Sequence, residues 1–307
     1  MKKKTLFVVN PVSGVGRQKR IETLIRQNLN QDLFDYEVRY TERIHHGTEL
    51  AREAADRGYD CVVAVGGDGS VNDVVQGLKD TDTRMGIVPA GSGNGLASSL
   101  HIPLQPWLAI RTLNQQYELT IDSIMVNDRY VCVNAAGVGF DAHISRLMQS
   151  AKSRGLTAYT NLVLRAYSNY ESHDYVLTLG GRTLLRNAWI IAVQNSSRIG
   201  YNMPVSPRAR IDDGIIDISI VDKIPVDHLP ITAPLAITNH LQLSQHVEMF
   251  RDKELLIEGN DDKWVDIDGE GINVGRTVHF VNHPRSVKLY GRDTRRPIII
   301  RNPAIKL

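Results

Sequence analysis

The sequence predicts two domains: an α/β domain with a parallel sheet, followed by a C-terminal β-rich domain whose antiparallel strands form a sandwich. Up to about residue 116, strand-like apolar runs alternate with segments of helical spacing, which is typical of a parallel sheet covered by helices. Beyond that point short strand-like runs and turn residues dominate, which favours a sandwich. We therefore expect the α/β domain over 1–120 and the β-rich domain over 121–289, with the segment of about 290–307 free to return to the first domain.

The elements of the first domain follow a β-α-β-α order. The expected strands are TLFVVN (5–10), YEVRYT (36–41), CVVAV (61–65) and MGIVP (85–89). Helical spacing predicts helices around Ile21–Leu29 and over 47–58, 71–79 and 106–113. Strands joined by helices in this way form a parallel sheet with helices on both faces.

The second half is read as short strands. They are ELTIDSIMV, RYVCVNAAG, YVLTLG, WIIAVQN, IIDISIV, KELLIEG, KWVDIDGE, TVHFVN and SVKLYG. Turn pairs such as Asn127-Asp128, Gly180-Gly181, Asp213-Gly214 and Gly259-Asn260 separate several of them. Helical segments interrupt the strands near 143–170 and 227–245.

Composition excludes several classes of protein. A net charge of +2 and an aromatic content of 6% argue against nucleic acid as a partner. Cys61 and Cys132 stand alone in apolar runs, as buried thiols of a reducing compartment do. The N-terminal apolar run is too short for a secretory signal, and no window approaches a membrane span. We expect a cytoplasmic protein that meets a membrane only transiently, at its surface.

Three predicted parallel strands end in loops of glycine and small polar residues. These loops are NPVSGVGR (10–17), GGDGSVND (66–73) and PAGSGNG (89–95). Ligands of open α/β sheets bind at the carboxyl ends of the strands, and bare N–H groups at glycines and helix N-termini suit phosphate oxygens. The sequence therefore predicts a phosphate site at this edge.

The second loop adds an acid to the glycines. Gly66 and Gly67 let the backbone approach a phosphate chain, and Gly69 eases entry into the helix. Asp68 repels phosphate unless Mg²⁺ lies between them or unless the carboxylate accepts a proton from an attacking hydroxyl. Either use indicates phosphoryl transfer. The P-loop, protein-kinase and dinucleotide fingerprints do not occur in this chain.

GGDGSVNDVVQGL (66–78) resembles the signature of the diacylglycerol kinase catalytic superfamily. That superfamily also holds sphingosine kinases, bacterial lipid kinases and, more distantly, NAD kinases and 6-phosphofructokinases. Further motifs agree in order: NPVSG (10–14), GIVPAGSGNGLASSLHIP (86–103), VNAAGVGFDAHI (133–144), ARIDDGIIDISIV (209–221) and DIDGE (266–270). The resemblance implies an N-terminal domain like that of 6-phosphofructokinase and NAD kinase, a C-terminal β-rich domain, and ATP in the cleft between them. It also implies Mg²⁺-dependent phosphorylation of a lipid hydroxyl.

The resemblance also implies roles for single residues. The nucleotide would bind to Gly66, Gly67, Asp68, Gly69, Ser70, Val71 and Asn72, with help from Asn10, Thr41 and Ser92. Glu270 resembles the proposed general base, and Asp68 is the competing candidate. A structural Mg²⁺ would be held by the side chain of Asp213 and the carbonyls of Arg210 and Ile215.

This chain departs from the family pattern in two places. Bacterial diacylglycerol kinases usually carry Asn-Asp where this chain has Asn94-Gly95, a form closer to the sphingosine-kinase branch. The second loop, GGDGSVND (66–73), usually ends in Asn-Glu in the family and here ends in Asn72-Asp73, so the shorter acid reaches less far.

Other polar residues allow two interpretations each. Asp122, among apolar neighbours, supports the metal or caps a turn. Asp141 lies near the acceptor headgroup under the resemblance, and Asp213-Gly214 can equally be a hairpin turn. The basic stretch 285–301 is a solvated face or contacts an anionic membrane surface.

Three hypotheses of function remain open at this stage. The first is an ATP- and Mg²⁺-dependent lipid kinase acting on diacylglycerol or a sphingoid base, and thus an enzyme of phospholipid metabolism. The second is a kinase of a soluble acceptor such as NAD. The third is a nucleotide-binding regulator without catalysis. A homodimer is compatible with all three, because sheet edges can pair between subunits.

Overall fold

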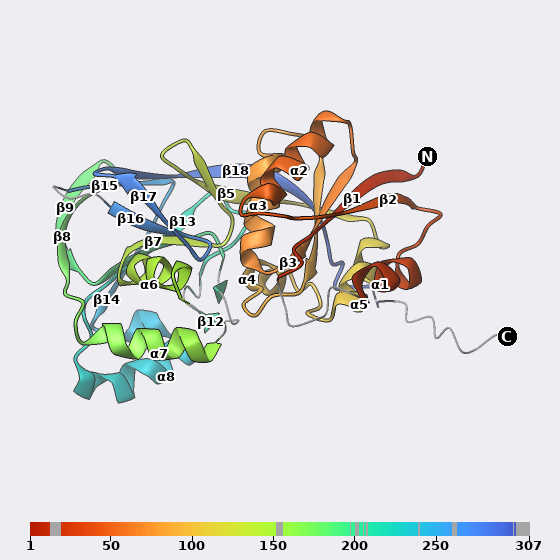
Figure 1. Cartoon of the computed structure of the whole chain (residues 1–307). Helices are drawn as coiled ribbons and strands as arrows, with labels where there is room; N and C mark the ends of the chain where they lie inside the picture. The colour runs from red at the N-terminus through yellow and green to blue at the C-terminus, as the bar shows by residue number, and fades with distance from the viewer. Residues whose placement is uncertain are drawn as a thin grey trace. The chain divides into compact units, whose positions relative to one another are not determined.

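The computed structural model describes residues 1–12, 20–151, 156–196, 198–199, 203–204, 206, 208–238, 240–259, 263–296 and 298 (Figure 1). Contacts divide the chain into two units. Unit 1 comprises Met1–Gly91, Leu100–Leu119 and the chain from Lys288 onward, and unit 2 comprises Ser92–Ser99 and Thr120–Val287. The third glycine loop is divided between them, although the sequence places it wholly in the first domain.

Unit 1 is built on a parallel sheet. Its strands are β1 (Lys3–Val9), β2 (Phe34–Tyr40), β3 (Cys61–Gly66) and β4 (Arg84–Pro89), in the order β2-β1-β3-β4. All six residues of β3 are buried, which requires cover on both faces. The covering helices are α1 (Ile21–Asn28), α2 (His46–Asp56), α3 (Asp68–Leu78) and α5 (Pro106–Leu113), of which α2 packs with α3 and α1 with α5.

Gly77 explains how closely α3 packs on α2. A Cβ atom at this position would lie 2.4 Å from the Thr48 carbonyl oxygen and 2.7 Å from the Ala51 Cβ. Only glycine therefore lets the two helices approach to this distance. The helix α3 begins at Asp68 and not at 71 as predicted, because Gly67 serves as its N-cap and the glycine loop is itself the first helical turn.

Unit 2 is an antiparallel sandwich with two sheets. One sheet contains β5 (Tyr117–Val126), β6 (Tyr130–Cys132), β8 (His173–Leu179), β9 (Arg182–Ala188), β15 (Glu254–Glu258) and β18 (Val278–Gly291). The other runs β14-β13-β10-β7-β16-β17, with bounds β7 (Ala135–Gly139), β10 (Ile190–Gln194), β13 (Ile216–Val221), β14 (Val247–Asp252), β16 (Lys263–Ile267) and β17 (Glu270–Gly275). Apolar residues from both sheets form one buried core. The predicted fold class of both halves is thus confirmed.

Short elements and helices complete unit 2. They are α4 (Gly95–Ser99), α6 (Phe140–Gln149), α7 (Leu156–Tyr167), β11 (Arg198–Ile199), β12 (Met203–Pro204), η3 (Val226–His228), α8 (Leu229–Ile237) and η4 (Leu241–Leu243), where η marks a 3₁₀ helix. The helix α6 packs on β7, β16 and β17, and Phe140 of α6 stacks on Trp189 with ring centroids 4.1 Å apart. The aromatic and apolar stripe of α7 packs against this cluster.

One expected strand boundary does not exist. The runs TVHFVN (277–282) and SVKLYG (286–291) are separate strands in the sequence prediction, but β18 is continuous over Val278–Gly291. Arg285 takes a positive φ of 52°, and its N–H donates to the Asp122 carboxylate at 2.7 Å. A kink anchored by this hydrogen bond therefore replaces a loop.

Cys61 and Cys132 are free and buried, as expected. Burial raises the pKa of both thiols. No helix among the described residues is long and apolar enough to cross a membrane.

Candidate functional site

The carboxyl ends of the parallel strands in unit 1 are tied together residue by residue. The Asn10 N–H donates to the Val65 carbonyl at 3.1 Å, the Thr41 N–H to Val9 at 2.9 Å, and the Ala90 N–H to Gly66 at 2.8 Å. The first residues after β1 and β4 therefore lie beside the end of β3, and the first residue after β2 lies beside the end of β1. This ladder brings Asn10 and Thr41 to the same edge as the loop that opens α3.

The N-terminus of α3 occupies that edge. Gly67 is the N-cap in an extended conformation, and no side chain caps the helix. The first N–H groups of a helix have no partner within the helix and carry its positive dipole end. Gly67 also lies against the next loop, since a Cβ on it would be 3.2 Å from the Gly91 Cα. Two glycine loops thus meet where an anion would be favoured.

Gly69 is a glycine that folding does not require. A Cβ atom built on it meets no atom of the described residues within 4 Å, and the residue is exposed in the first turn of α3. Alanine has a higher helix propensity than glycine and would stabilise the helix more at this position. The empty space above Gly69 is therefore consistent with room kept for a ligand.

Side chains join the first loop to the helix. The Asn10 amide donates to the Ser70 hydroxyl at 3.2 Å, and the Asn10 carbonyl oxygen accepts from the Val12 N–H at 3.0 Å. Val71 is buried and its N–H bonds the Gly67 carbonyl, so its side chain belongs to the core. Asn72 is buried and accepts from Gln76. Residues 13–19 of the predicted loop lie outside the described residues.

Asp73 forms a contact that the sequence did not reveal. Its carboxylate lies 3.2 Å from the His45 Nδ1, and burial raises its pKa while the hydrogen bond to His45 opposes the rise. His45 has a positive φ of 59° and precedes α2. The shorter acid in place of the family's glutamate thus ties the loop after β2 to α3. His45 is the N-cap residue of α2, and His46 is its first residue.

In unit 2, Glu270 is positioned by a tight hairpin turn. Asp268 and Gly269 take positive φ values of 51° and 93°, and Ile267 pairs with Glu270 across the turn, as in a type I′ hairpin. The Asp268 carboxylate accepts from the N–H groups of Val133, Asn134 and Ala135. Glu270 therefore begins β17 directly after a turn that hydrogen bonds fix to residues 133–135, at the start of β7.

Asp141 lies opposite a second acid, Asp266. The would-be Cβ of Gly137 is 2.1 Å from Asp141 Oδ2, and Gly137 pairs directly with Asp266 across β7 and β16. The Asp141 carboxyl thus occupies the space that a side chain at position 137 would fill. Paired residues of this kind hold their Cβ atoms about 5 Å apart, so the two carboxyls face each other.

Burial and mutual repulsion hold protons on this acid pair. Burial and the Asp266 charge raise the pKa of Asp141 well above its ordinary range. Burial raises the pKa of Asp266 to about 7, although the Ser145 hydroxyl, 2.6 Å from Oδ1, opposes the rise. Two carboxyls in one site cannot both ionise near neutral pH.

Asp122 is fully buried and connects two segments of unit 2. Its carboxylate accepts from the Gly214 N–H at 2.6 Å and the Arg285 N–H at 2.7 Å. The Asp122 N–H donates to the Ile211 carbonyl at 2.8 Å. A buried acid satisfied in this way fixes the loop of Asp213 to the kink of β18.

Arg251 contacts the predicted metal ligand Asp213. Its Nη2 lies 2.5 Å from Asp213 Oδ2, and its Nε lies 3.4 Å from Asp217 Oδ1. No group of three or more His, Cys, Asp or Glu side chains among the described residues could hold a metal ion. The guanidinium already supplies positive charge to Asp213, which argues against a resident cation on that carboxylate. The ligand set of Asp213 with the carbonyls of Arg210 and Ile215 stays a prediction.

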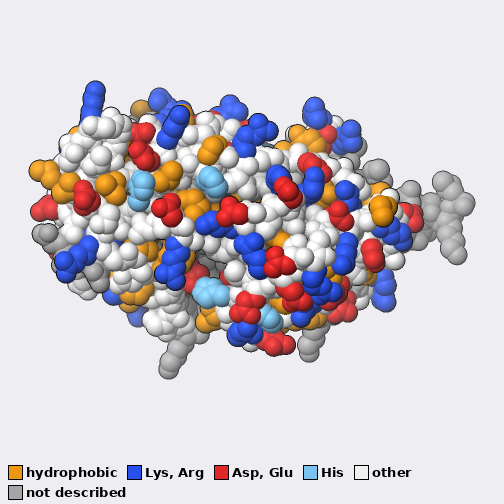
Figure 2. Space-filling model, turned by 90° about the horizontal axis from the view of Figure 1, so that it is seen from above, with side chains coloured by type: hydrophobic (Ala, Val, Ile, Leu, Met, Phe, Trp, Pro, Cys, Tyr) orange, Lys and Arg blue, Asp and Glu red, His pale blue; other side chains and the backbone are white. Residues whose placement is uncertain are grey.

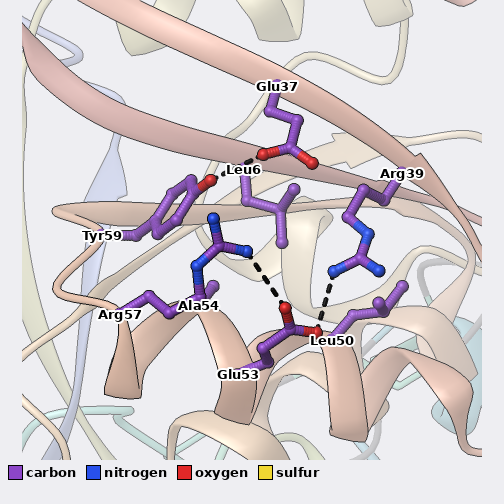
Figure 3. Close-up of a pocket in the computed structure, with 8 residues that line it drawn as sticks. All are labelled: Leu6, Glu37, Arg39, Leu50, Glu53, Ala54, Arg57 and Tyr59. Carbon is purple, nitrogen blue, oxygen red and sulfur yellow. Dashed lines mark hydrogen bonds and ion pairs between the residues drawn. The ribbon is translucent and has the colours of Figure 1, made fainter.

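Unit 1 also contains a small pocket away from the predicted nucleotide-binding residues. This pocket, between β2 and α2, is lined by Leu6, Glu37, Arg39, Leu50, Glu53, Ala54, Arg57 and Tyr59 (Figure 3). Its two acids accept hydrogen bonds from Arg39, Arg57 and Tyr59, and none of the predicted nucleotide-binding residues lines it. On the face shown in Figure 2, acidic and basic side chains are interspersed, in keeping with a net charge of +2.

The structure brings together some predicted residues and leaves others apart. Asn10, Thr41 and the stretch from Gly66 to Asn72 share one edge of unit 1. Ser92 is exposed and belongs to unit 2. Unit 2 also contains Arg210, Ile215, Asp122, Asp141, Asp213 and Glu270. Asp266 and Arg251 were missed by the sequence reasoning. Asp266 alternates with the buried Val265 and Ile267, and that period of two could have marked it as facing α6.

Two family models match this chain. The diacylglycerol kinase catalytic domain matches residues 4–126, and the YegS C-terminal NAD kinase beta sandwich-like domain matches residues 134–290. The diacylglycerol kinase of Bacillus subtilis is 25% identical over 291 residues, which cover 92% of this chain and 95% of that protein. A Chromohalobacter salexigens protein named "probable lipid kinase YegS-like" is 32% identical over 190 residues, or 60% of this chain and 61% of that protein.

Solved structures show the same fold. A diacylglycerol kinase from Bacillus anthracis superposes with a TM-score of 0.74 at 20% identity, over 95% of this chain and 97% of that one. The two family matches together cover nearly all of the described chain, and the resemblance predicted from the motifs is confirmed. The chain belongs to the diacylglycerol kinase and YegS-like lipid kinase family.

Proposed function

We propose that this protein is a lipid kinase that transfers the γ-phosphate of ATP to a lipid hydroxyl, with diacylglycerol as the acceptor. The observation that carries the proposal is the strand-edge site of unit 1, where the capless N-terminus of α3 meets two glycine loops. The curated relatives support this choice of acceptor, because the kinase matched over 92% of this chain is named for diacylglycerol.

The nucleotide's phosphates would bind the N–H groups at the start of α3. Gly66, Gly67 and Gly69 let the phosphate chain approach the backbone, while Asn10 and Ser70 hold the two loops in register. ATP reaches a kinase as its magnesium complex, so the metal enters here as part of the substrate. A cation between the phosphates and Asp68 would turn a repulsive carboxylate into an attractive one.

The reaction would join the lipid hydroxyl oxygen to the γ-phosphorus and break its bond to the bridging oxygen of ADP. The hydroxyl proton passes to a carboxylate as the new bond forms. Asp68 and Glu270 are the two candidates for this base. Asp68 lies in the first turn of α3, beside the N–H groups that would bind the phosphates. Glu270 is held by the hairpin turn of Asp268 and Gly269.

A lipid panel with radiolabelled ATP tests the proposal directly. Purified protein is incubated with diacylglycerol, a sphingoid base or NAD, and the products are separated by chromatography. Label in phosphatidic acid supports the proposal. Label in a sphingoid base or in NAD would reassign the acceptor, and ATP binding without label in any acceptor would contradict the kinase assignment.

Two variants on α3 test the site. Asp68→Asn should lower kcat by at least 10²-fold, since a general base or a carboxylate that meets the metal contributes on this scale, while Asp56→Asn, at an exposed position of α2, should leave kcat unchanged. Gly69→Ala should leave the melting temperature unchanged or slightly raised, because its Cβ meets no atom of the described residues, and should raise the KM for ATP. A Gly69→Ala protein with normal KM would show that no phosphate approaches this turn.

A further inference from the structure

The segment between β13 and β14 exposes apolar side chains without a partner. Val226 in η3 is 70% exposed, Ile231 in α8 is 70% exposed, and Leu243 in η4 is 67% exposed. In Figure 1 this segment lies at the edge of unit 2. From His228 to Val247 the sequence contains no Asp, Glu, Lys or Arg. This stretch carries two of the three aliphatic side chains, Ile231 and Leu243, and Val226 precedes it beside the exposed Asp227. Exposed aliphatic side chains gathered on so weakly charged a segment are unusual for a surface in contact with water only.

The helix α8 has no polar face. Its sequence, LPITAPLAI, contains Thr232 as its one polar residue. A helix on the surface of a globular protein normally exposes a polar stripe to water. Pro230 and Pro234, both exposed, have no N–H group. This helix thus presents apolar groups, and few hydrogen-bond donors, to its surroundings.

Several polar groups of the segment have partners in it or next to it. The Thr232 hydroxyl donates to the His228 carbonyl at 3.1 Å, and the Thr238 hydroxyl donates to the Pro234 carbonyl at 2.8 Å. The rings of His228 and His246 are joined by a hydrogen bond of 2.8 Å, which fastens η3 to the residue before β14. Because these groups already have partners, moving the segment out of water would break few hydrogen bonds.

The exposed area is too small for a stable protein interface. Three aliphatic side chains of about 100 Å² each give roughly 300 Å² of apolar surface. A stable protein–protein interface buries about 800 Å² on each partner. The same three side chains are sufficient for shallow insertion into a bilayer, because insertion needs apolar area and no complementary shape.

We propose that the segment Val226–Leu243 is the membrane-docking surface of this protein, and that Val226, Ile231 and Leu243 insert into the lipid layer. The proposal rests on the proposed function, since a kinase of diacylglycerol must collect its acceptor from a membrane. The contact is apolar and depends little on charge, unlike the basic stretch 285–301.

The test is binding to large vesicles made of phosphatidylcholine and phosphatidylglycerol at 7:3, measured by co-sedimentation. Burial of one such side chain corresponds to about a tenfold change in partition, so the triple variant Val226→Asn, Ile231→Asn, Leu243→Asn should bind at least 100-fold more weakly. Leu185→Asn is the matched control, because Leu185 on β9 is 74% exposed and should not affect binding. The variant Ile231→Trp should strengthen binding, and its emission should shift to the blue with vesicles.

Other outcomes would overturn the proposal. Unchanged vesicle binding in the triple variant would do so, and loss of binding in 0.5 M salt would assign the contact to basic residues. A concentration-dependent dimer that the triple variant abolishes would show that a second copy covers the segment.

Activity on dispersed short-chain diacylglycerol separates this proposal from the kinase proposal. The triple variant should keep that activity and lose activity on vesicles. A protein that binds vesicles through this segment but phosphorylates no lipid would contradict the proposed function alone.

Discussion

Replacing Asp266 by asparagine should stabilise unit 2 above neutral pH. In the folded protein burial raises the pKa of Asp266 to about 7 from an ordinary value of 3.8. The folded state therefore keeps a proton that the unfolded chain releases above pH 4. The stability that this proton contributes is present below pH 4, falls as the pH rises toward 7, and is absent above it.

The size of the effect follows from this change in pKa. At 1.36 kcal/mol for each pKa unit, a rise of this size corresponds to about 4 kcal/mol. Asp266 is partly exposed, so solvent screening reduces the expected difference to about 2 kcal/mol. Asparagine keeps an oxygen for the Ser145 hydroxyl and can donate its amide to Asp141. The variant should thus exceed the wild type by about 2 kcal/mol at pH 8.5 and match it at pH 4.

Urea unfolding followed by tryptophan fluorescence at several pH values measures this difference. Trp189 and Trp264 lie in unit 2, and Trp264 lies two residues from Asp266 on β16. Asp227→Asn, at an exposed position, is the control and should leave the pH profile unchanged. A variant less stable than wild type at pH 8.5, or a difference independent of pH, would refute the opposed acid pair.

Two further predictions concern packing and charge. Gly77→Ala should lower the free energy of unfolding by about 1–3 kcal/mol, because the new methyl group would clash with the Thr48 carbonyl. Urea unfolding measures this loss. An unchanged free energy of unfolding would show that α2 can shift away from α3 without cost. Arg251→Gln should make the melting temperature sensitive to Mg²⁺, because Asp213 and Asp217 lose their cation. The wild type should melt at the same temperature in Mg²⁺ and in chelator, and a clear rise in Mg²⁺ would show that the wild type holds a cation as well as Arg251.

Much of the nucleotide edge could be predicted from sequence. Glycine-rich loops after buried strands indicate where strands end, and parallel strands bring their carboxyl ends to one edge. Asn10, Thr41 and the stretch from Gly66 to Asn72 are neighbours for this reason. The exact start of α3 was missed, because Gly67 and Gly69 allow a loop as readily as a first helical turn.

The acids of unit 2 could be named but not paired. Asp141, Asp213 and Asp122 were each singled out from their local motifs, yet their partners Asp266, Arg251 and Arg285 come from segments 38 or more residues away. Cross-strand register decides these partners, and register is set by the whole sheet. The resemblance indicated a metal at Asp213, whereas the fold brings the guanidinium of a neighbouring strand to the same carboxylate.

The sequence by itself determined the class of each half, the loops at the strand ends and the family. All of these depend on residues within one turn or one strand of each other, so local periodicity and backbone freedom are sufficient to predict them. Only the tertiary structure decided that Asp141 of α6 faces Asp266 of β16, that an arginine meets Asp213, and that α8 exposes apolar side chains. Those outcomes depend on which distant segments meet, and no local pattern records that.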